Sequence, residues 1–458
     1  MYNKLKRVRG GSYLHMKKTI IVAGAGHGGL AAAALLAKNG FDVTIYEKSE
    51  RAALGYDWTD IFAPGALKIA DIPMPAADKF TYKDNMTFYS PDCKKGLVQN
   101  VPQDQLEIKM ERKDIYDLLV KNAENSGVKF VFGCEVTAPI LLGNRVVGIK
   151  TAKGDFYGDL VIDACGIDSP VRKNLPQYLS IEKESGEFSR FYVYRAFYNK
   201  ASEKAVKDVY KVYMLPQGKL GIGWVASEEE FTDVLIGRFE PLTDEEINES
   251  LSVMQKENIR LGDKVVRGGQ RVTIPVRQPL GVLVADGYAA IGDSAFMTVP
   301  IIGSGIANSL KAARILVDVV SSDKDGAFSL ETLWKYQLGF YKTLGSGLAA
   351  LACVKLLLTK LLPEELDFMF ETGVLTANDL TIGADSTSLA AMLSGITPAD
   401  LLNKAKNVIK DKVLLKKILK TGERIAAVTA VTSAMPKSPT AASVSRWAKQ
   451  YNKCFKIK

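Results

Sequence analysis

Apolar runs alternate with a helical pattern near the start of the chain. Residues 19–23 are a β-branched apolar run, which is typical of a buried parallel strand. Residues 30–38 are rich in Ala and Leu and are followed by Asn39 and Gly40, which predicts a helix with a glycine C-cap. Residues 41–47 form a second strand-like run that ends in Glu47. This order predicts a strand–helix–strand unit at the start of an α/β sheet.

The same patterns assign the rest of the chain. Helices are predicted at 111–126, 243–256, 306–317 and, for the most part, from about 328 onward. Strands are predicted at 128–132, 134–160 (a meander), 160–164, 187–280, 282–284 and 289–291, the last two returning to the first sheet. Residues 80–82 and 86–89 are predicted to pair as one hairpin.

Composition places the chain among soluble globular proteins. Its 458 residues are 47% hydrophobic and 24% charged, which is enough for two or three domains. With only His15 and His27, a histidine triad or a multi-histidine metal site is nearly excluded. The cysteines form no CxxC pair, so we expect a reducing compartment and no disulfide framework, zinc or iron–sulfur site. They are Cys93, Cys134, Cys165, Cys353 and Cys454.

Positive charge is concentrated in the C-terminal tail. Residues 401–458 hold 14 Lys and Arg against two Asp and Glu, which exceeds the formal net charge of +9 of the whole chain. A basic tail suits an anionic membrane surface or an acidic partner, and a solvated helical face is the plain alternative. Nucleic acid is the third kind of partner that a basic tail suits, and it is not the one expected here.

Two lysine-bearing apolar segments lie in the C-terminal third, at 344–362 and 401–419. The first is interrupted by Lys355 and Lys360, so no stretch is predicted to span a membrane. Both segments fit either helices lying on an anionic bilayer or a helical cap on the first domain. Residues 1–16 are basic without an apolar core, so they are not a secretory signal, and Met16 is an alternative start to Met1.

The turn after the first strand contains a candidate binding motif. Gly24, Gly26 and Gly29 have the GxGxxG spacing that lets a pyrophosphate approach a helix N-terminus. Glu47 follows about 20 residues on, where a carboxylate accepts from a ribose hydroxyl, and this favours FAD or NAD over NADP. The predicted dinucleotide-binding residues here are Gly24, Ala25, Gly26, His27, Gly28, Gly29, Glu47 and Lys48.

Two more motifs follow, at 163–172 (DACGIDSPVR) and at 291–306, where Gly292-Asp293 precedes Pro300 and Gly303-Ser304-Gly305-Ile306. Together with the glycine motif they resemble the FAD-dependent oxidoreductases of the p-hydroxybenzoate hydroxylase fold. Within these the chain looks most like the geranylgeranyl reductase branch, which also includes the electron-transfer flavoprotein–quinone oxidoreductase type. The resemblance covers about residues 17–320.

The resemblance implies an α/β fold: a Rossmann-type FAD-binding domain, an inserted antiparallel β-sheet substrate domain and a helical C-terminal region. The implied divisions are 1–16 (basic extension), 17–77 with 101–175 and 281–325 (FAD), 78–100 with 176–280 (substrate), and 326–458 (helical, basic).

The resemblance also implies roles for single residues. Asp293 would hold the ribityl hydroxyls, Arg112 would lie near the FAD phosphates or flavin, and Val136 would meet the adenine. The helix N-terminus at Gly303, Ser304, Gly305 and Ile306, preceded by Pro300, would stabilise negative charge on the flavin.

The chain departs from the family in three places. Phe296 stands where monooxygenases of this fold often have His, and 54–57 lacks the cysteine often found beside the flavin. The lipid-pocket signature of the branch is weakened at 211–218. The predicted substrate-binding residues there are Tyr213, Leu215, Pro216 and Gly218. No catalytic residue is assigned, and the candidate proton donors, by residue type alone, are Tyr56, Tyr192 and Tyr213.

The leading hypothesis is a reductase in which flavin N5 delivers hydride to a C=C of an apolar, isoprenoid-like substrate. One alternative is an NAD(P)H- and oxygen-dependent monooxygenase of aromatic or polyketide-like substrates, and another is a peripheral electron-transfer flavoprotein feeding quinone. Because no second GxGxxG unit is evident, the electron donor must be external: NAD(P)H, ferredoxin or a flavoprotein. We expect a cytoplasmic protein, with a position at the inner face of the membrane as the alternative.

Overall fold

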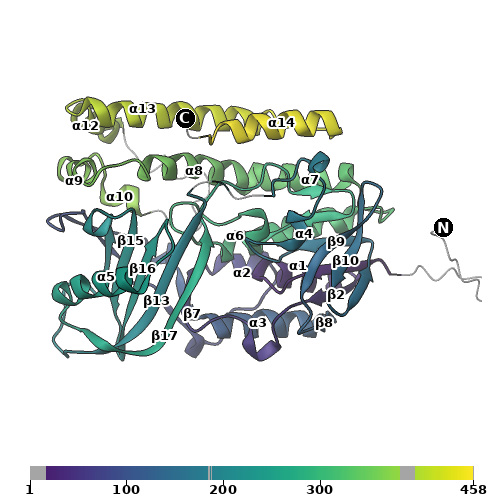
Figure 1. Ribbon diagram of the computed structural model, residues 1–458, viewed down its shortest axis with the longest axis horizontal. Helices are drawn as coiled ribbons and strands as arrows, with labels where there is room; N and C mark the ends of the chain where they lie inside the picture. Colours follow the sequence, from purple (N-terminus) through teal and green to yellow (C-terminus); the bar gives the residue numbers. More distant parts are fainter. Residues whose placement is uncertain (1–16, 184–185, 187, 382–397, 457–458) are drawn as a thin grey trace, which may run out of the picture.

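The computed structural model describes residues 17–183, 186, 188–381 and 398–456. The predicted N-terminal extension lies outside these residues. The molecule is elongated, with the nucleotide-binding sheet at one end and a large antiparallel sheet at the other (Figure 1). A layer of C-terminal helices runs along the top of both in this view.

The first sheet confirms the predicted strand–helix–strand unit. Its strand order is β18-β19-β12-β1-β2-β8, and all neighbours are parallel except β18 and β19. The strands are β1 (Thr19–Ala23), β2 (Asp42–Tyr46), β8 (Lys129–Val131), β12 (Leu160–Asp163), β18 (Val284–Ala285) and β19 (Tyr288–Ala290). The helices packed with it are α1 (His27–Lys38), α3 (Arg112–Asn125) and α6 (Ile306–Ser322). Their apolar faces form one core with the strands.

The predicted meander is a three-stranded antiparallel sheet beside the first. Its order is β11-β10-β9, from β9 (Val136–Leu142), β10 (Arg145–Thr151) and β11 (Gly154–Tyr157). Tight turns at Gly143 and Gly154, both with positive φ, join the strands as the sequence indicates.

The second domain is a seven-stranded sheet, β17-β13-β16-β15-β14-β5-β6. Its strands are β5 (Thr87–Tyr89), β6 (Gly96–Val98), β13 (Arg190–Lys200), β14 (Tyr210–Met214), β15 (Gly221–Ser227), β16 (Phe231–Arg238) and β17 (Leu261–Pro275). The inserted helix α5 (Asp244–Glu257) begins with a capping box at Thr243 and Glu246. Short elements α2 (Gly65–Ile69) and α4 (Pro170–Lys173) complete the first two domains.

The predicted hairpin of 80–82 with 86–89 is wrong. Strand β4 (Phe80–Tyr82) pairs with β7 (Ile108–Glu111) in a separate sheet with β3 (Thr59–Phe62), whereas β5 joins the large sheet beside β14. Strand β5 pairs with the nearby β6 on one side and with the distant β14 on the other, where Tyr89 stacks on Tyr213 and its hydroxyl donates to Asp208 over 2.6 Å. A short link between two strand-like runs does not reveal such distant partners.

The C-terminal region is helical and packs on the rest of the chain. Helix α13 lies along α8, and Trp447 and Tyr451 of α14 enter the main core. The Tyr451 hydroxyl donates to the carbonyl of Pro279 over 3.0 Å. The helices are α7 (Leu330–Phe340), α8 (Ser346–Leu358), α9 (Pro363–Thr372), α10 (Ala377–Leu380), α12 (Pro398–Val408), α13 (Lys412–Ser433) and α14 (Ala441–Lys453), with a π-helical turn, η7 (Tyr341–Gly345), between α7 and α8. The predicted cap on the first domain is therefore present for 344–362, whereas 401–419 packs with α9 and the large sheet instead.

The continuous helix Leu330–Leu358 corrects the expectation that no stretch is long and apolar enough to cross a membrane. Its 29 residues are enough to cross a bilayer, and its most apolar 18-residue stretch has a mean hydropathy of 1.3. Of that stretch, 61% is buried inside the protein. Its polar groups bond to the core: Tyr336 donates to the carbonyl of Ala290 and Tyr341 to that of Leu280. A core helix of this kind meets the same criterion, so the test alone is weak evidence for a span.

Candidate cofactor and substrate site

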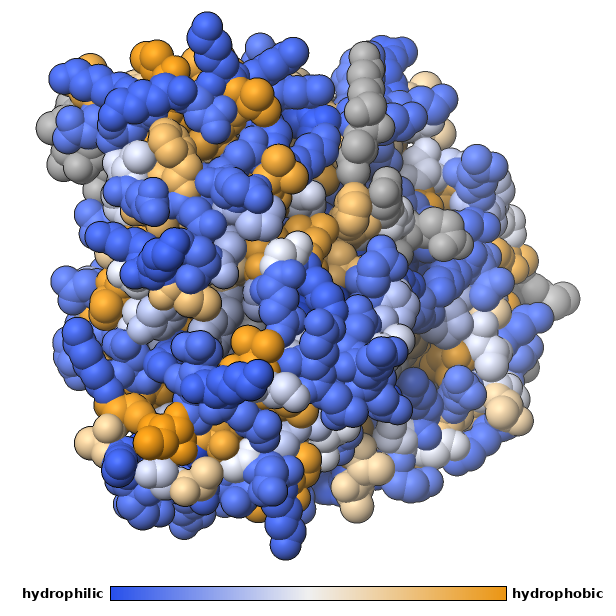
Figure 2. Space-filling view, turned by 60° about the vertical axis from the view of Figure 1, so that its left-hand side comes forward, coloured by the Kyte–Doolittle hydropathy of each residue, from blue (hydrophilic) through white to orange (hydrophobic). Residues whose placement is uncertain are grey.

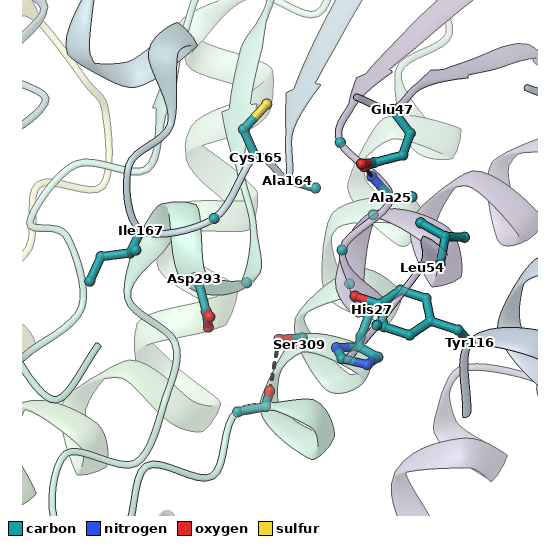
Figure 3. Close-up of a pocket in the computed structure, with 18 of the residues that line it drawn as sticks. Ala25, His27, Glu47, Leu54, Tyr116, Ala164, Cys165, Ile167, Asp293 and Ser309 are labelled. Atoms are coloured by element: carbon teal, nitrogen blue, oxygen red, sulfur yellow. Dashed lines mark hydrogen bonds between the residues drawn. The ribbon is translucent and has the colours of Figure 1, made fainter. Parts of the chain in front are cut away.

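A cleft of about 950 Å³ opens beside the carboxyl ends of the first sheet. Residues of all three sequence motifs line it, although they are far apart along the chain (Figure 3). Of the predicted cofactor-binding residues, all except Pro300 lie on its wall. They are Gly24, Ala25, Gly26, His27, Gly28, Gly29, Glu47, Lys48, Arg112, Val136, Gly292, Asp293, Gly303, Ser304, Gly305 and Ile306.

The glycine turn is fixed by close contact with strand β12. Gly24 has φ +88°, and a Cβ atom there would lie 2.6 Å from the carbonyl oxygen of Ala164. A Cβ on Gly29 would meet the Ala164 side chain at 2.6 Å. Helix α1 then begins at His27 without a side-chain cap, so its first N–H groups face the cleft without a partner inside the helix. This geometry suits a pyrophosphate.

Glu47 holds this turn in place. One carboxylate oxygen accepts from the backbone N–H of Ala25 over 2.7 Å, and the other accepts from Ser49 over 2.8 Å. Glu47 therefore ties the glycine turn to the end of β2. Because each carboxylate oxygen can accept more than one hydrogen bond, contact with a ribose hydroxyl stays a prediction.

His27 is a buried polar residue without a protein partner for one nitrogen. Its Nε2 has no hydrogen bond within the described residues, and its ring lies 4.8 Å from that of Tyr116. Burial, and then the charge of Arg112, lower the pKa of His27 to about 3, so the imidazole is neutral. Buried polar atoms are nearly always paired, so this atom indicates a ligand with polar groups in the cleft.

Arg112 lines the cleft but is already engaged. Its Nη1 donates to both carboxylate oxygens of Asp60, over 2.8 and 2.9 Å, and its guanidinium lies 4.1 Å from the ring centre of Tyr56. Burial lowers its pKa, but Asp60 and the neighbouring tyrosines outweigh burial, so the net pKa is raised. The predicted role of Arg112 at the phosphates or flavin stays a prediction.

Asp293 supplies a carboxylate on the opposite wall from the glycine turn (Figure 3). It lies in the 3-10 turn η6 (Gly292–Ala295), directly after the strand β19. Burial raises its pKa to about 6, and the charge of Arg112 opposes that shift. An acceptor at this place fits the hydroxyl groups of a ribityl chain.

Asp163, for which no role was predicted, connects the second and third motifs. Its carboxylate accepts from the hydroxyls of Ser169 (2.5 Å), Tyr288 (2.9 Å) and Ser294 (3.0 Å), and it is completely buried. Asp163 therefore positions two loops of the cleft without facing it. The sequence pattern that could have indicated this role is an acidic residue at the end of an otherwise apolar strand.

A second, largely apolar cavity of about 320 Å³ adjoins the cleft. It lies between the large sheet, the loop at Pro300 and the C-terminal helices α8 and α9. The two cavities share six wall residues: Trp58, Asp60, Ile61, Ile274, Gly303 and Ser304. The loop that opens α6 therefore faces both spaces.

The predicted substrate-binding residues are only partly on this cavity. Leu215 lines it, whereas Tyr213 stacks on Tyr89 and accepts from the Asn258 side chain, and Pro216 and Gly218 form a turn near Pro363. Strand residues alternate between faces, so Val212 and Met214 line the cavity and Tyr213 faces away.

The same alternation decides between the candidate proton donors. On β13, Phe191 and Val193 line the apolar cavity, so Tyr192 lies on the other face. Of the three tyrosines, Tyr56 alone lines the cofactor cleft, and burial raises its pKa, so its phenol stays protonated at neutral pH.

Comparison with known proteins agrees with this geometry. Residues 22–89 match the family model of the NAD(P)-binding Rossmann-like domain. A digeranylgeranylglycerophospholipid reductase of Methanothrix thermoacetophila is 24% identical over 348 residues, which cover 73% of this chain and 85% of the relative. A geranylgeranyl bacteriochlorophyll reductase-like protein of Thermoplasma acidophilum superposes with TM-score 0.69 at 18% identity, covering 87% of this chain and all of that one.

The fold is shared more widely. PqsL of Pseudomonas aeruginosa, described as a probable FAD-dependent monooxygenase, superposes with TM-score 0.58 at 18% identity over 78% of this chain and all of its own. The fold and the cleft thus define a FAD-dependent oxidoreductase of the type shared by geranylgeranyl reductases and flavin monooxygenases. The glycine turn and the unpartnered His27 fit FAD as its cofactor.

Proposed function

We propose that the protein is a FAD-dependent reductase that saturates C=C bonds of a hydrophobic, isoprenoid-like substrate. The observation that carries the proposal is the apolar cavity that shares its wall with the cofactor cleft at Gly303 and Ser304. The names of the reductase relatives, which align across most of the chain, support the same chemistry.

The residues of the chain bind and orient; the cofactor supplies the redox chemistry. FAD, when bound, supplies hydride to the substrate carbon. The turn at 24–29 and the N-terminus of α1 would hold its phosphates, and Asp293 would accept from its hydroxyls. The N-terminus of α6, which begins at Ile306, would offer unpaired N–H groups and a positive dipole end to the isoalloxazine.

The apolar cavity would exclude water from the substrate. Its wall includes Trp58, Phe191 and Trp224, and most of its charged groups take part in ion pairs, either with each other or with residues behind the wall. Tyr56, at the cleft, is the candidate for supplying the proton that completes saturation.

A second candidate function is oxygen-dependent hydroxylation, because PqsL shares the fold. The position that often holds His in such enzymes is Phe296, whose ring lies 4.6 Å from the guanidinium carbons of both Arg172 and Arg277. A phenyl ring packed against two arginines cannot transfer a proton as histidine does, and this favours the reductase.

One experiment separates the two functions. The FAD-loaded protein is incubated with a geranylgeranyl lipid, once anaerobically with dithionite and once in air with NADPH, and the products are analysed by mass spectrometry. A reductase adds two hydrogens per double bond in the anaerobic sample. Addition of an oxygen atom only in air, with no anaerobic product, would transfer the assignment to the monooxygenase. Anaerobic flavin reduction rates with NADH, NADPH, ferredoxin and an electron-transfer flavoprotein would identify the external donor.

We also propose that the protein docks on an anionic membrane surface through α12 and α13. Five exposed lysines and four exposed apolar side chains are interspersed along these helices and the turn 409–411 between them, a composition that suits the bilayer interface. They are Lys406, Lys410, Lys412, Lys416 and Lys420, with Leu402, Ile409, Val413 and Leu419. Figure 2 shows hydrophobic patches among hydrophilic side chains at the top of the molecule, where these helices lie. A cytoplasmic protein would meet such a surface at the inner face of the membrane.

Co-sedimentation with vesicles tests this docking. The protein should bind vesicles of phosphatidylglycerol but not of phosphatidylcholine, and salt should weaken the binding. The double variant Lys412→Glu/Lys416→Glu should lose binding. The matched variant Lys449→Glu/Lys453→Glu on α14 changes the charge equally and should keep it. Equal loss in both variants would show that net charge, and not this surface, is responsible.

A further inference from the structure

The charges on the wall of the apolar cavity are paired, with one exception. Five ionisable residues on the wall belong to four ion pairs within the described residues, and these pairs add little net charge. These are Lys83–Glu107, Asp60–Arg112, Arg195–Asp233 and Asp379–Lys404. The remaining ionisable residue on the wall, Lys355, has no carboxylate partner in the described part of the chain. Among the described residues, Lys355 is therefore the one charged group on this wall without an oppositely charged partner.

Lys355 projects from α8, in the layer between the large sheet and α13 (Figure 1). The residue is 4% exposed. Its ammonium donates to the carbonyl of Phe188 over 2.7 Å and lies 5.7 Å from the ring centre of Phe239. An ammonium group has three N–H donors, so this single acceptor leaves most of its hydrogen-bonding capacity unused.

The other unsatisfied groups on the same wall are also donors. The indole Nε1 atoms of Trp58 and Trp224 are buried and have no acceptor within the described residues. The buried side-chain atoms on this wall that have no partner among the described residues are thus both donors, and with the Lys355 ammonium they complement a ligand rich in acceptors.

The protonation state of Lys355 suits an acidic ligand. Burial, and then the charge of Arg277, lower its pKa to about 8, so the group is still charged at neutral pH. Arg277 itself is paired with Glu182 over 3.0 Å. A bound anion would relieve the burial of the charge, whereas a neutral hydrocarbon would leave it uncompensated.

We propose that Lys355 determines substrate specificity by binding an acidic oxygen, a phosphate or carboxylate, of an amphiphile whose apolar chain fills the cavity. The inference rests on the proposed reductase function, because it names the class of substrate for that site. Lys355 belongs to the C-terminal region, so this region contributes to substrate recognition as well as covering the fold.

Ligand binding without turnover tests the proposal. The full chain is loaded with FAD, given no electron donor, and titrated with geranyl phosphate and with geraniol while tryptophan fluorescence is recorded. Trp58 and Trp224 line the cavity and report binding. We expect the wild type to prefer the phosphate by at least about tenfold, as a charged hydrogen bond provides. Inorganic phosphate alone should not displace it.

Three variants make the test specific. Lys355→Met should bring the two affinities close together, and Lys355→Arg should restore much of the preference because it keeps the charge. Lys449→Met, an exposed lysine on α14, should behave as the wild type. The proposal is overturned if Lys355→Met keeps the preference, if the wild type has none, or if inorganic phosphate displaces geranyl phosphate at equal concentration.

The reductase function and the role of Lys355 can be refuted independently of each other. A Lys355-dependent preference without anaerobic C=C reduction would refute the reductase function and leave the anion site in place. C=C reduction without the preference would refute only the role of Lys355. Loss of FAD from Lys355→Met, with unchanged ligand preference, would show that the lysine serves the cofactor instead.

Discussion

Replacing Lys355 by methionine should make the protein more stable at neutral pH. The lysine is buried, charged and without a carboxylate partner among the described residues, so the folded state bears the cost of desolvating it. Methionine has a similar length and fills the same space with an apolar chain. A residue kept at a cost to stability is what a binding function for Lys355 requires.

The magnitude follows from the pKa. Burial lowers the pKa of Lys355 from 10.5 to about 8, and one pKa unit corresponds to about 1.36 kcal/mol, so the charged form costs the folded state about 3 kcal/mol at pH 7. Methionine also leaves the carbonyl of Phe188 without its donor, which costs about 1 kcal/mol. The net expectation is that Lys355→Met is more stable by about 2 kcal/mol.

The difference should depend on pH in a defined direction. Between pH 8 and 10.5 the unfolded chain binds a proton at Lys355 that the folded chain has released, so wild-type stability rises with pH in this window. Lys355→Met lacks that rise, and its advantage should disappear by about pH 10.

Urea unfolding of both FAD-loaded proteins with excess FAD, at pH 7 and pH 10, measures the effect. Effects of high pH on other residues cancel in the comparison of the two proteins. A variant that is less stable than the wild type at pH 7, or an advantage that does not change with pH, would refute the picture of an unpaired buried charge.

Three further predictions concern the cofactor and substrate site. Asp293 has a pKa of about 6 without cofactor, and accepting from FAD hydroxyls favours its ionised form, so FAD affinity should fall as pH drops below 6. The Asp293→Asn variant should bind FAD about tenfold more weakly and lose this pH dependence, as measured by flavin fluorescence. Gly24→Ala combines a positive φ with a clash against a backbone carbonyl, so it should lower the stability of the fold by about 2 kcal/mol or more and abolish FAD binding. The control Gly143→Ala has a similar φ in open space, so it should lower stability by about 1 kcal/mol and keep FAD, as seen by thermal melts. Met214→Ala should raise the substrate KM several-fold, while Tyr213→Phe should leave it unchanged, because only the first residue lines the cavity.

The nucleotide-binding unit was predictable because its signals are local and contiguous. Residues 19–47 contain a strand, a glycine turn, a helix and a second strand in order, and each glycine has a steric reason that the structure confirms at Gly24 and Gly29. The later motifs come to the same cleft because the carboxyl ends of parallel strands meet at one edge of a sheet.

Register and distant pairing were not predictable from the same patterns. In the stretch 211–218 a one-residue choice of face decides whether Tyr213 or Met214 reaches the substrate cavity. The hairpin error at 80–89 has a related cause, since β5 pairs with the following β6 and with β14, more than a hundred residues later, instead of with β4. Local propensity carries no information on which distant strand is nearest.

Lys355 shows how a residue gains its meaning from tertiary structure. In the sequence it only interrupts an apolar segment and counts against a membrane span. In the fold, α8 places it in the substrate cavity, and α13 covers the other side of that helix. One helical layer therefore separates the cavity, whose Lys355 has no carboxylate partner in the described ranges, from an outer surface of lysines and apolar side chains on α12 and α13. An acidic amphiphile is complementary to both surfaces, so the proposed docking and the proposed substrate specificity require the same ligand chemistry. Losing docking through Lys412→Glu/Lys416→Glu should then slow turnover of a substrate in vesicles while leaving the binding of soluble geranyl phosphate unchanged.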